Sequence, residues 1–115
     1  HFIPGIAEVS SSLPDADVLV ACDCGDEQRL GDNLSKQLTR FRTVINLDHH
    51  ISNNYFGTLN FIDAKACSTA EIIFALLERA AWDVNVDVAN CLLAGVVACC
   101  PLPGIARGRW YRVLL

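Results

Sequence analysis

Three adjacent polar residues, Asp48, His49 and His50, could do chemistry together. One carboxylate and two imidazoles can bind a divalent metal ion or contact a phosphate group. A surface turn that happens to contain two histidines would show the same triplet. The preceding run from Thr43 to Leu47 is apolar and rich in β-branched residues, which predicts a buried strand. Ligands of open α/β sheets bind at the carboxyl ends of strands, and the triplet occupies such an end.

A second carboxylate is expected at the same edge of the sheet. Residues 16–22 form a continuous apolar run that predicts another strand, and Asp23 follows it directly. Between the two strands, Asp26 can cap a helix over residues 27–40, in which leucines recur every four residues. Strand, helix and strand in this order form a crossover with parallel strands. Asp23 and the Asp48–His50 triplet should therefore emerge side by side.

The rest of the chain predicts one more strand and two helices. A short strand is expected over residues 58–62. Ser68 and Glu71 have the spacing of a capping box, which predicts the start of a helix that runs to about Ala80. A second helix is expected over residues 87–98, and it should be buried because nearly all of its residues are apolar.

Size and composition favour one α/β domain that is buried on both faces. The chain has 115 residues, of which 52% are hydrophobic and 19% charged, with a mean hydropathy of +0.32. The same balance would suit a piece of a larger protein. A net charge of −4 argues against tight non-specific binding to a nucleic-acid backbone, which needs a basic surface. No apolar run approaches the ~18 residues of a membrane span.

The cysteines are interpreted as reduced, mostly buried thiols of a cytoplasmic protein. No signal peptide is visible, and the cysteines lie inside apolar runs. Cys22 and Cys24 flank Asp23, so a cysteine-based zinc site is a minor alternative. The six cysteines are Cys22, Cys24, Cys67, Cys91, Cys99 and Cys100.

Five motifs follow one another along the chain: Val20–Asp23, Asp48–Asn53, Phe56-Gly57, Asn60–Asp63 and Ser68–Glu71. This ordered set resembles the DHH phosphoesterase superfamily. Its spacing is most similar to the bacterial nanoRNase and pAp phosphatase group of bifunctional oligoribonucleases. The resemblance covers about residues 15–98.

The resemblance implies a fold and a set of roles. The fold would be part of a three-layer, Rossmann-like α/β domain with a parallel sheet that holds two divalent metals, usually Mn²⁺. Asp23 matches the carboxylate that bridges the metals, and His49 matches a metal ligand. His50 matches a histidine close to the metals and the substrate phosphate, and Asp48 would orient the histidines. Two metals roughly 3.5–4 Å apart can hold a hydroxide and polarise a phosphoryl oxygen.

Several polar residues have a structural explanation beside a functional one. Ser52 and Asn53 could position a substrate phosphate or merely satisfy loop backbone groups. Asp26 is interpreted as a helix cap and Glu71 as a capping-box partner rather than as ligands. Asp63 can close a turn as easily as contact a substrate.

The departures from the family pattern predict an incomplete site. The family's first motif, an Asp-x-Asp preceded by a histidine, is not found, and neither is its second lobe. Cys99 to Pro101 stand where the family has another metal-binding aspartate. Residues 99–115 are therefore expected to be a divergent tail, disordered or frame-shifted, and removing them should cost little stability.

The predicted function is that of a catalytic-lobe fragment of a Mn²⁺-dependent phosphoesterase. The parent enzyme would hydrolyse short oligoribonucleotides or nucleotide 3′-phosphates such as pAp with a metal-activated water, and this chain by itself would be inactive. One alternative is a cyclic-dinucleotide phosphodiesterase or a RecJ-type single-strand exonuclease. Another is a non-catalytic α/β binding module in which Asp23 and the histidines make structural hydrogen bonds.

Overall fold

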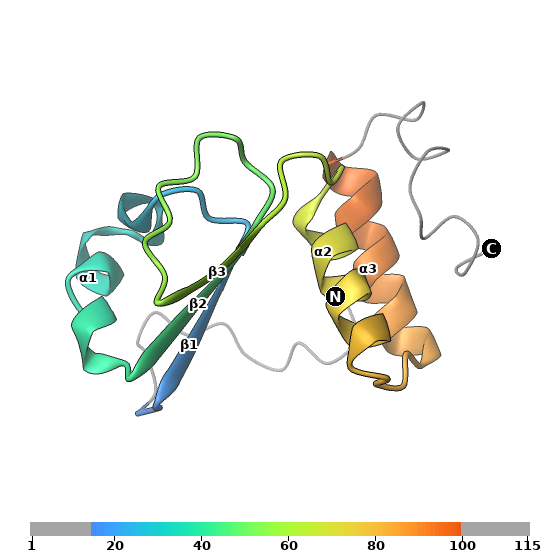
Figure 1. Cartoon of the computed structure of the whole chain (residues 1–115), viewed down its shortest axis with the longest axis horizontal. Helices are drawn as coiled ribbons and strands as arrows, with labels where there is room; N and C mark the ends of the chain where they lie inside the picture. The colour runs from blue at the N-terminus through green and yellow to red at the C-terminus, as the bar shows by residue number, and fades with distance from the viewer. Residues whose placement is uncertain (1–14, 100–115) are drawn as a thin grey trace. The chain divides into compact units, whose positions relative to one another are not determined.

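The computed structural model describes residues 15–99 (Figure 1). Within this range the chain divides after Ala64 into two compact units. The first unit carries a parallel sheet, and the second carries two longer helices. No helix within residues 15–99 is long and apolar enough to span a membrane. Of the predicted tail, only Cys99 is described, as the last residue of a helix; residues 100–115 lie outside the described range.

The sheet of the first unit has three parallel strands in the order β1, β2, β3 (Figure 1). The strands are β1 (Val18–Cys22), β2 (Thr43–Asp48) and β3 (Leu59–Ile62). The predicted crossover with parallel strands is confirmed. Cys22 pairs with Leu47 in the register, so the residues that follow β1 and β2 emerge at the same edge.

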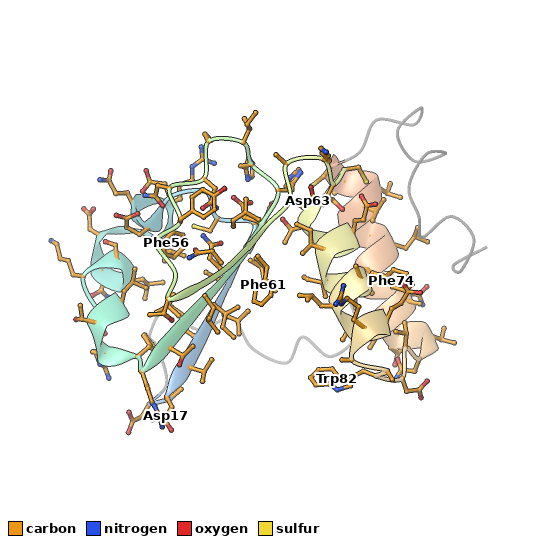
Figure 2. The ribbon with its side chains drawn as sticks, viewed as in Figure 1. Asp17, Phe56, Phe61, Asp63, Phe74 and Trp82 are labelled. Atoms are coloured by element: carbon orange, nitrogen blue, oxygen red, sulfur yellow. The ribbon has the colours of Figure 1, made fainter. Side chains whose placement is uncertain are left out.

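The two faces of the sheet differ in burial. Ala21 and Val44 are buried, and so is Asn46. Since side chains alternate along a strand, the residues on either side of these face the other way. That opposite face is apolar and is exposed along β1 and β3, although Leu47 of β2 is buried. Figure 2 shows Phe61 on this face, away from the short helices of this unit. Its exposed residues are Val18, Val20, Leu59 and Phe61.

The continuous helix predicted over residues 27–40 is wrong. The segment forms a 3-10 helix η1 (Glu27–Leu30), a single turn α1 (Asp32–Ser35) and a 3-10 helix η2 (Leu38–Arg40). Gly31 has φ +87° and ψ 153°, a conformation almost confined to glycine, and it ends the first piece. The leucines of this segment are only half-buried.

Asp26 caps the first of these pieces, as predicted. Its side chain accepts a hydrogen bond of 2.8 Å from the backbone N–H of Gln28. Phe41 follows the last piece and is buried, so the segment remains anchored to the core of the unit although its helix is broken.

The second unit contains α2 (Thr69–Arg79) and α3 (Val86–Cys99), side by side in Figure 1. The predicted capping box is confirmed with one difference: the Glu71 side chain bonds to the residue before the N-cap Ser68. The Ser68 hydroxyl accepts from the Glu71 N–H at 3.4 Å, while the Glu71 carboxylate accepts from the N–H of Cys67 at 2.8 Å.

Phe74 of α2 packs with Leu92 and Val96 of α3 to form the core of the second unit (Figure 2). The prediction that the last helix is buried as a whole is wrong, because Val86 and Val97 are 75% and 56% exposed. An apolar composition without a strong period does not reveal which face of a helix is covered.

Replacement of Gly31 by alanine distinguishes the broken segment from a continuous helix. We expect Gly31→Ala to lower the free energy of unfolding by about 1–3 kcal/mol, since an L side chain rarely adopts this backbone conformation. Urea denaturation of the chain would measure the change, with exposed Lys36→Ala as a control of small effect. In a continuous helix the same substitution would instead stabilise the protein by about 0.5–1 kcal/mol.

Candidate metal centre

The ends of β1 and β2 bring three ligand-bearing side chains together. Asp23, His49 and His50 each offer one ligand atom, and these atoms all lie within 4.8 Å of one another. The backbone N–H of Asp23 donates to the carbonyl of Leu47 at 2.9 Å, which extends the pairing of the strands by one residue. The site therefore forms at the edge that the sequence predicted.

Asp23 and His49 face each other at a solvent-accessible part of the site. The Oδ1 atom of Asp23 lies 3.5 Å from Nε2 of His49, and the side chains are 48% and 20% exposed. Asp23 has φ +58°, a left-handed conformation that is uncommon for a residue with a side chain. A cation from solvent can therefore reach both side chains in the folded chain.

His50 is held by the buried carboxylate of Asp48. Its Nδ1 atom lies 2.7 Å from Oδ1 of Asp48, which is completely buried. An ionised carboxylate can only accept a hydrogen bond, so the proton of this contact belongs to Nδ1 of the ring. Nε2 of His50 is then the nitrogen that can bind a metal, an arrangement common among metal-ligating histidines. The predicted orienting role of Asp48 agrees with this contact to His50.

The second oxygen of Asp48 accepts a 2.6 Å hydrogen bond from Nδ2 of Asn53. Burial by itself favours the neutral form of this carboxyl, but the hydrogen bonds from Asn53 and His50 outweigh that effect. A bond from the backbone N–H of His49 acts in the same direction. The pKa of Asp48 therefore lies below its ordinary value of 3.8, and the side chain is a buried anion at neutral pH.

The two residues predicted to bind substrate differ in their surroundings. Ser52 is exposed in the turn that follows the triplet. Asn53 is buried, with 7% of its surface exposed, and its amide contacts Asp48, Cys24, Tyr55 and Asn46.

The comparison with known proteins agrees with this geometry. Residues 3–96 match the DHH family, N-terminal domain. The chain belongs to the DHH family. The family predicted from the motifs is thereby confirmed.

Two curated DHH relatives carry the name bifunctional oligoribonuclease and PAP phosphatase NrnA. The protein from Bacillus subtilis is 24% identical over 99 residues, which cover 84% of this chain and 31% of the relative. The protein from Thermus thermophilus is 29% identical over 100 residues, which cover 84% of this chain and 29% of the relative. The chain thus spans less than a third of the length of either relative.

A solved structure supports the DHH fold. The crystal structure of an exopolyphosphatase-related protein from Bacteroides fragilis matches with a TM-score of 0.73 and 23% identity. The match covers 87% of this chain and 30% of that protein. The predicted α/β class with a parallel sheet is confirmed by this likeness.

The cysteines of the DHH chain do not join the ligand group within residues 15–99. Cys24 is buried, its thiol donates to the carbonyl of Asp26 at 3.1 Å, and burial raises its pKa. Cys22 and Cys99 are exposed, so the prediction that the thiols are mostly buried is only partly correct. The alternative of a cysteine-based zinc site receives no support from the described residues.

Two residues beside the candidate site were not predicted. A side chain at Gly25 would place its Cβ 3.5 Å from both Oδ2 of Asp48 and Cβ of His50, an ordinary van der Waals contact, so the loop after β1 lies against the triplet at this residue. Asn46 is fully buried, and its Oδ1 atom has no hydrogen-bond partner among the described residues. The signal for Asn46 was present: it is a polar residue inside an apolar strand, in phase with Asp48.

The lowered pKa of Asp48 predicts a pH-dependent contribution to stability in the metal-free chain. A carboxylate of this kind stabilises the folded state above its ordinary pKa of 3.8, and the contribution is lost as the pH falls through the lower folded value. Asp48→Asn should therefore lower the free energy of unfolding by about 1–3 kcal/mol at neutral pH. The difference from the wild type should shrink as the pH is lowered below 3.8.

Urea denaturation over this pH range, beside the exposed control Asp32→Asn, measures the effect. A difference between wild type and Asp48→Asn that stays constant with pH would show that folding does not lower the pKa of Asp48, contrary to the expected effect of its hydrogen bonds.

Proposed function

We propose that this chain provides metal-binding residues of a Mn²⁺-dependent DHH phosphoesterase that hydrolyses short oligoribonucleotides or nucleotide 3′-phosphates such as pAp. The observation that carries the proposal is the group of Asp23, His49 and His50, whose ligand atoms lie within 4.8 Å at the carboxyl edge of a parallel sheet. The names of the two curated relatives supply the substrate class.

The donor set fits a divalent transition metal. Imidazole nitrogen and carboxylate oxygen are both accepted by Mn²⁺, and the network behind His50 presents its Nε2 as the ligand atom. When bound, such a cation would supply Lewis acidity toward a phosphoryl oxygen and make an attacking water more acidic. Three donors fill only about half of an octahedral shell, so we expect weak binding by this chain alone.

The residues around the metal group have distinct tasks in the proposal. Asp23 contributes the negative charge that attracts a cation to the exposed side of the site. His50 is kept in one tautomer by Asp48. Ser52 is exposed and can donate its hydroxyl to a substrate phosphate. Asn53 is less suited to that task, because its amide is already engaged within the protein.

Metal binding can be tested by calorimetric titration of the chain with Mn²⁺. We expect Asp23→Ala and His49→Ala each to weaken the affinity by at least about tenfold, because each removes a donor from a small set. Asp32→Ala removes an exposed carboxylate elsewhere in the same unit and should leave the affinity unchanged.

Equal affinities for the wild type and for the Asp23 and His49 variants would contradict the assignment. Such a result would place the cation elsewhere and would favour a non-catalytic α/β module in which Asp23 and His49 have structural roles.

The substrate class can be tested with pAp, a diribonucleotide, a cyclic dinucleotide and single-stranded DNA, each supplied with Mn²⁺. We expect no appreciable hydrolysis by the 115-residue chain, because its metal group has few donors. A longer gene product that carries this segment should hydrolyse the first two compounds and lose that activity on His50→Ala. Preference for the cyclic dinucleotide or for DNA would contradict the proposed substrate and indicate another branch of the family.

A further inference from the structure

Asn53 joins the two loops that carry the candidate metal-binding residues Asp23, His49 and His50. Its Nδ2 atom donates to Oδ2 of Asp48 at 2.6 Å and to the carbonyl of Cys24 at 3.3 Å. Its Oδ1 atom accepts from the backbone N–H of Tyr55 at 2.7 Å and from Nδ2 of Asn46 at 3.5 Å. A primary amide has two N–H donors and two acceptor lone pairs, so these contacts use its full capacity.

From this we infer that Asn53 is a positioning residue: it sets the orientation of His50 through Asp48 and the separation of the two ligand-bearing loops. The inference rests on the proposed function, because the group it positions is the proposed metal site. Of the two uses considered for Asn53 in the sequence, contact with a substrate phosphate and hydrogen bonding within the loop, this inference favours the second.

The orientation of His50 depends on both oxygens of Asp48. Oδ1 accepts from His50 and Oδ2 accepts from Asn53, so the carboxylate cannot rotate without breaking both bonds. In the buried surroundings of Asp48, loss of the amide donor would remove one of the hydrogen bonds that hold the carboxylate and would favour rotation. The ring of His50 would then lose the acceptor that keeps its proton on Nδ1.

The separation of the loops depends on the contact with Cys24. This bond spans 29 residues of sequence and ties the loop after β1, which begins at Asp23, to the loop after β2. The backbone N–H of Asn54 donates to the carbonyl of Gly25 at 2.9 Å and reinforces the same junction. Together these bonds fix Asp23 relative to the histidines.

The buried side chain of Asn46 gives further support to the inference, because it contacts Asn53. It lies on β2, is fully buried, and contacts Asn53 through a long bond of 3.5 Å. Its own Oδ1 atom has no partner among the described residues, which is unfavourable for stability. An apolar residue would suit this strand position better, so the contact with Asn53 is the feature that explains an amide here.

The test compares Asn53→Asp, Asn53→Ser and the control Asn54→Asp. Asn53→Asp keeps the shape of the side chain, removes both N–H donors and places a second carboxylate beside Asp48. Asn53→Ser keeps one donor. Asn54→Asp makes the same chemical change one residue further on, where the exposed amide contacts Glu27.

The main measurement is the tautomer of His50 in the metal-free chain, from long-range ¹H–¹⁵N correlations at a pH where both imidazoles are neutral. The wild type and Asn54→Asp should carry the proton on Nδ1. Asn53→Asp should give a mixture of tautomers or the Nε2–H form, and Asn53→Ser an intermediate population. Titration with Mn²⁺ should show an affinity at least about tenfold weaker for Asn53→Asp.

Each outcome decides the inference. An Nε2–H tautomer in the wild type overturns it, and this holds even if the Asn53 variants do not fold. Folded Asn53 variants with the wild-type tautomer and wild-type Mn²⁺ affinity also overturn it, while the proposed metal site would stand if Asp23→Ala still abolished binding. A tautomer that shifts in the Asn53 variants supports the positioning role, even where no chain binds Mn²⁺ and the proposed function fails.

Discussion

The buried carboxylate of Asp48 is the constraint on which the site depends. A charge without solvent access is tolerated only when hydrogen bonds replace the water it has lost. Asp48 obtains them from the His50 ring, the Asn53 amide and the backbone N–H of His49. The need to satisfy one anion thus orders the turn after β2 and presents the histidines at the edge of the sheet.

The parallel register determines where that edge lies. Because Cys22 pairs with Leu47, the chain leaves β1 and β2 at the same level, and Asp23 meets His49 without any long side chain having to reach across. At Gly25 the loop after β1 then lies in contact distance of Asp48 and His50. Backbone pairing therefore brings the residues of the site together, and side-chain hydrogen bonds then fix their orientation.

Under the proposed function, the same geometry gives a metal ion access to the described group but offers it few donors. Asp23 and His49 are partly open to solvent, whereas the network that holds His50 is buried. A metal site needs both properties, an entry path for the ion and rigid support behind its ligands. The two NrnA relatives are more than three times as long as the segment they share with this chain.

Local patterns in the sequence were sufficient for the strands, for the caps at Asp26 and Ser68, and for the meeting of Asp23 with the triplet. These features depend on residues close in sequence or on the general rule for parallel crossovers. The break at Gly31 was not predicted, since the leucines keep a helical spacing in the sequence although the helix is interrupted. The exposure of Val97 also depends on which face the neighbouring helix covers, which composition does not specify.

The role of Asn53 shows what only the tertiary structure decided. In the sequence, an asparagine after the triplet could equally bind phosphate or satisfy a loop, because both uses need the same amide. Its partner Cys24 lies 29 residues away, and its contact with Asp48 exists only once the two loops have met. Residue types and their order therefore determined which groups could serve the chemistry, while folding determined which of them are left facing solvent and which are used to hold the others in place.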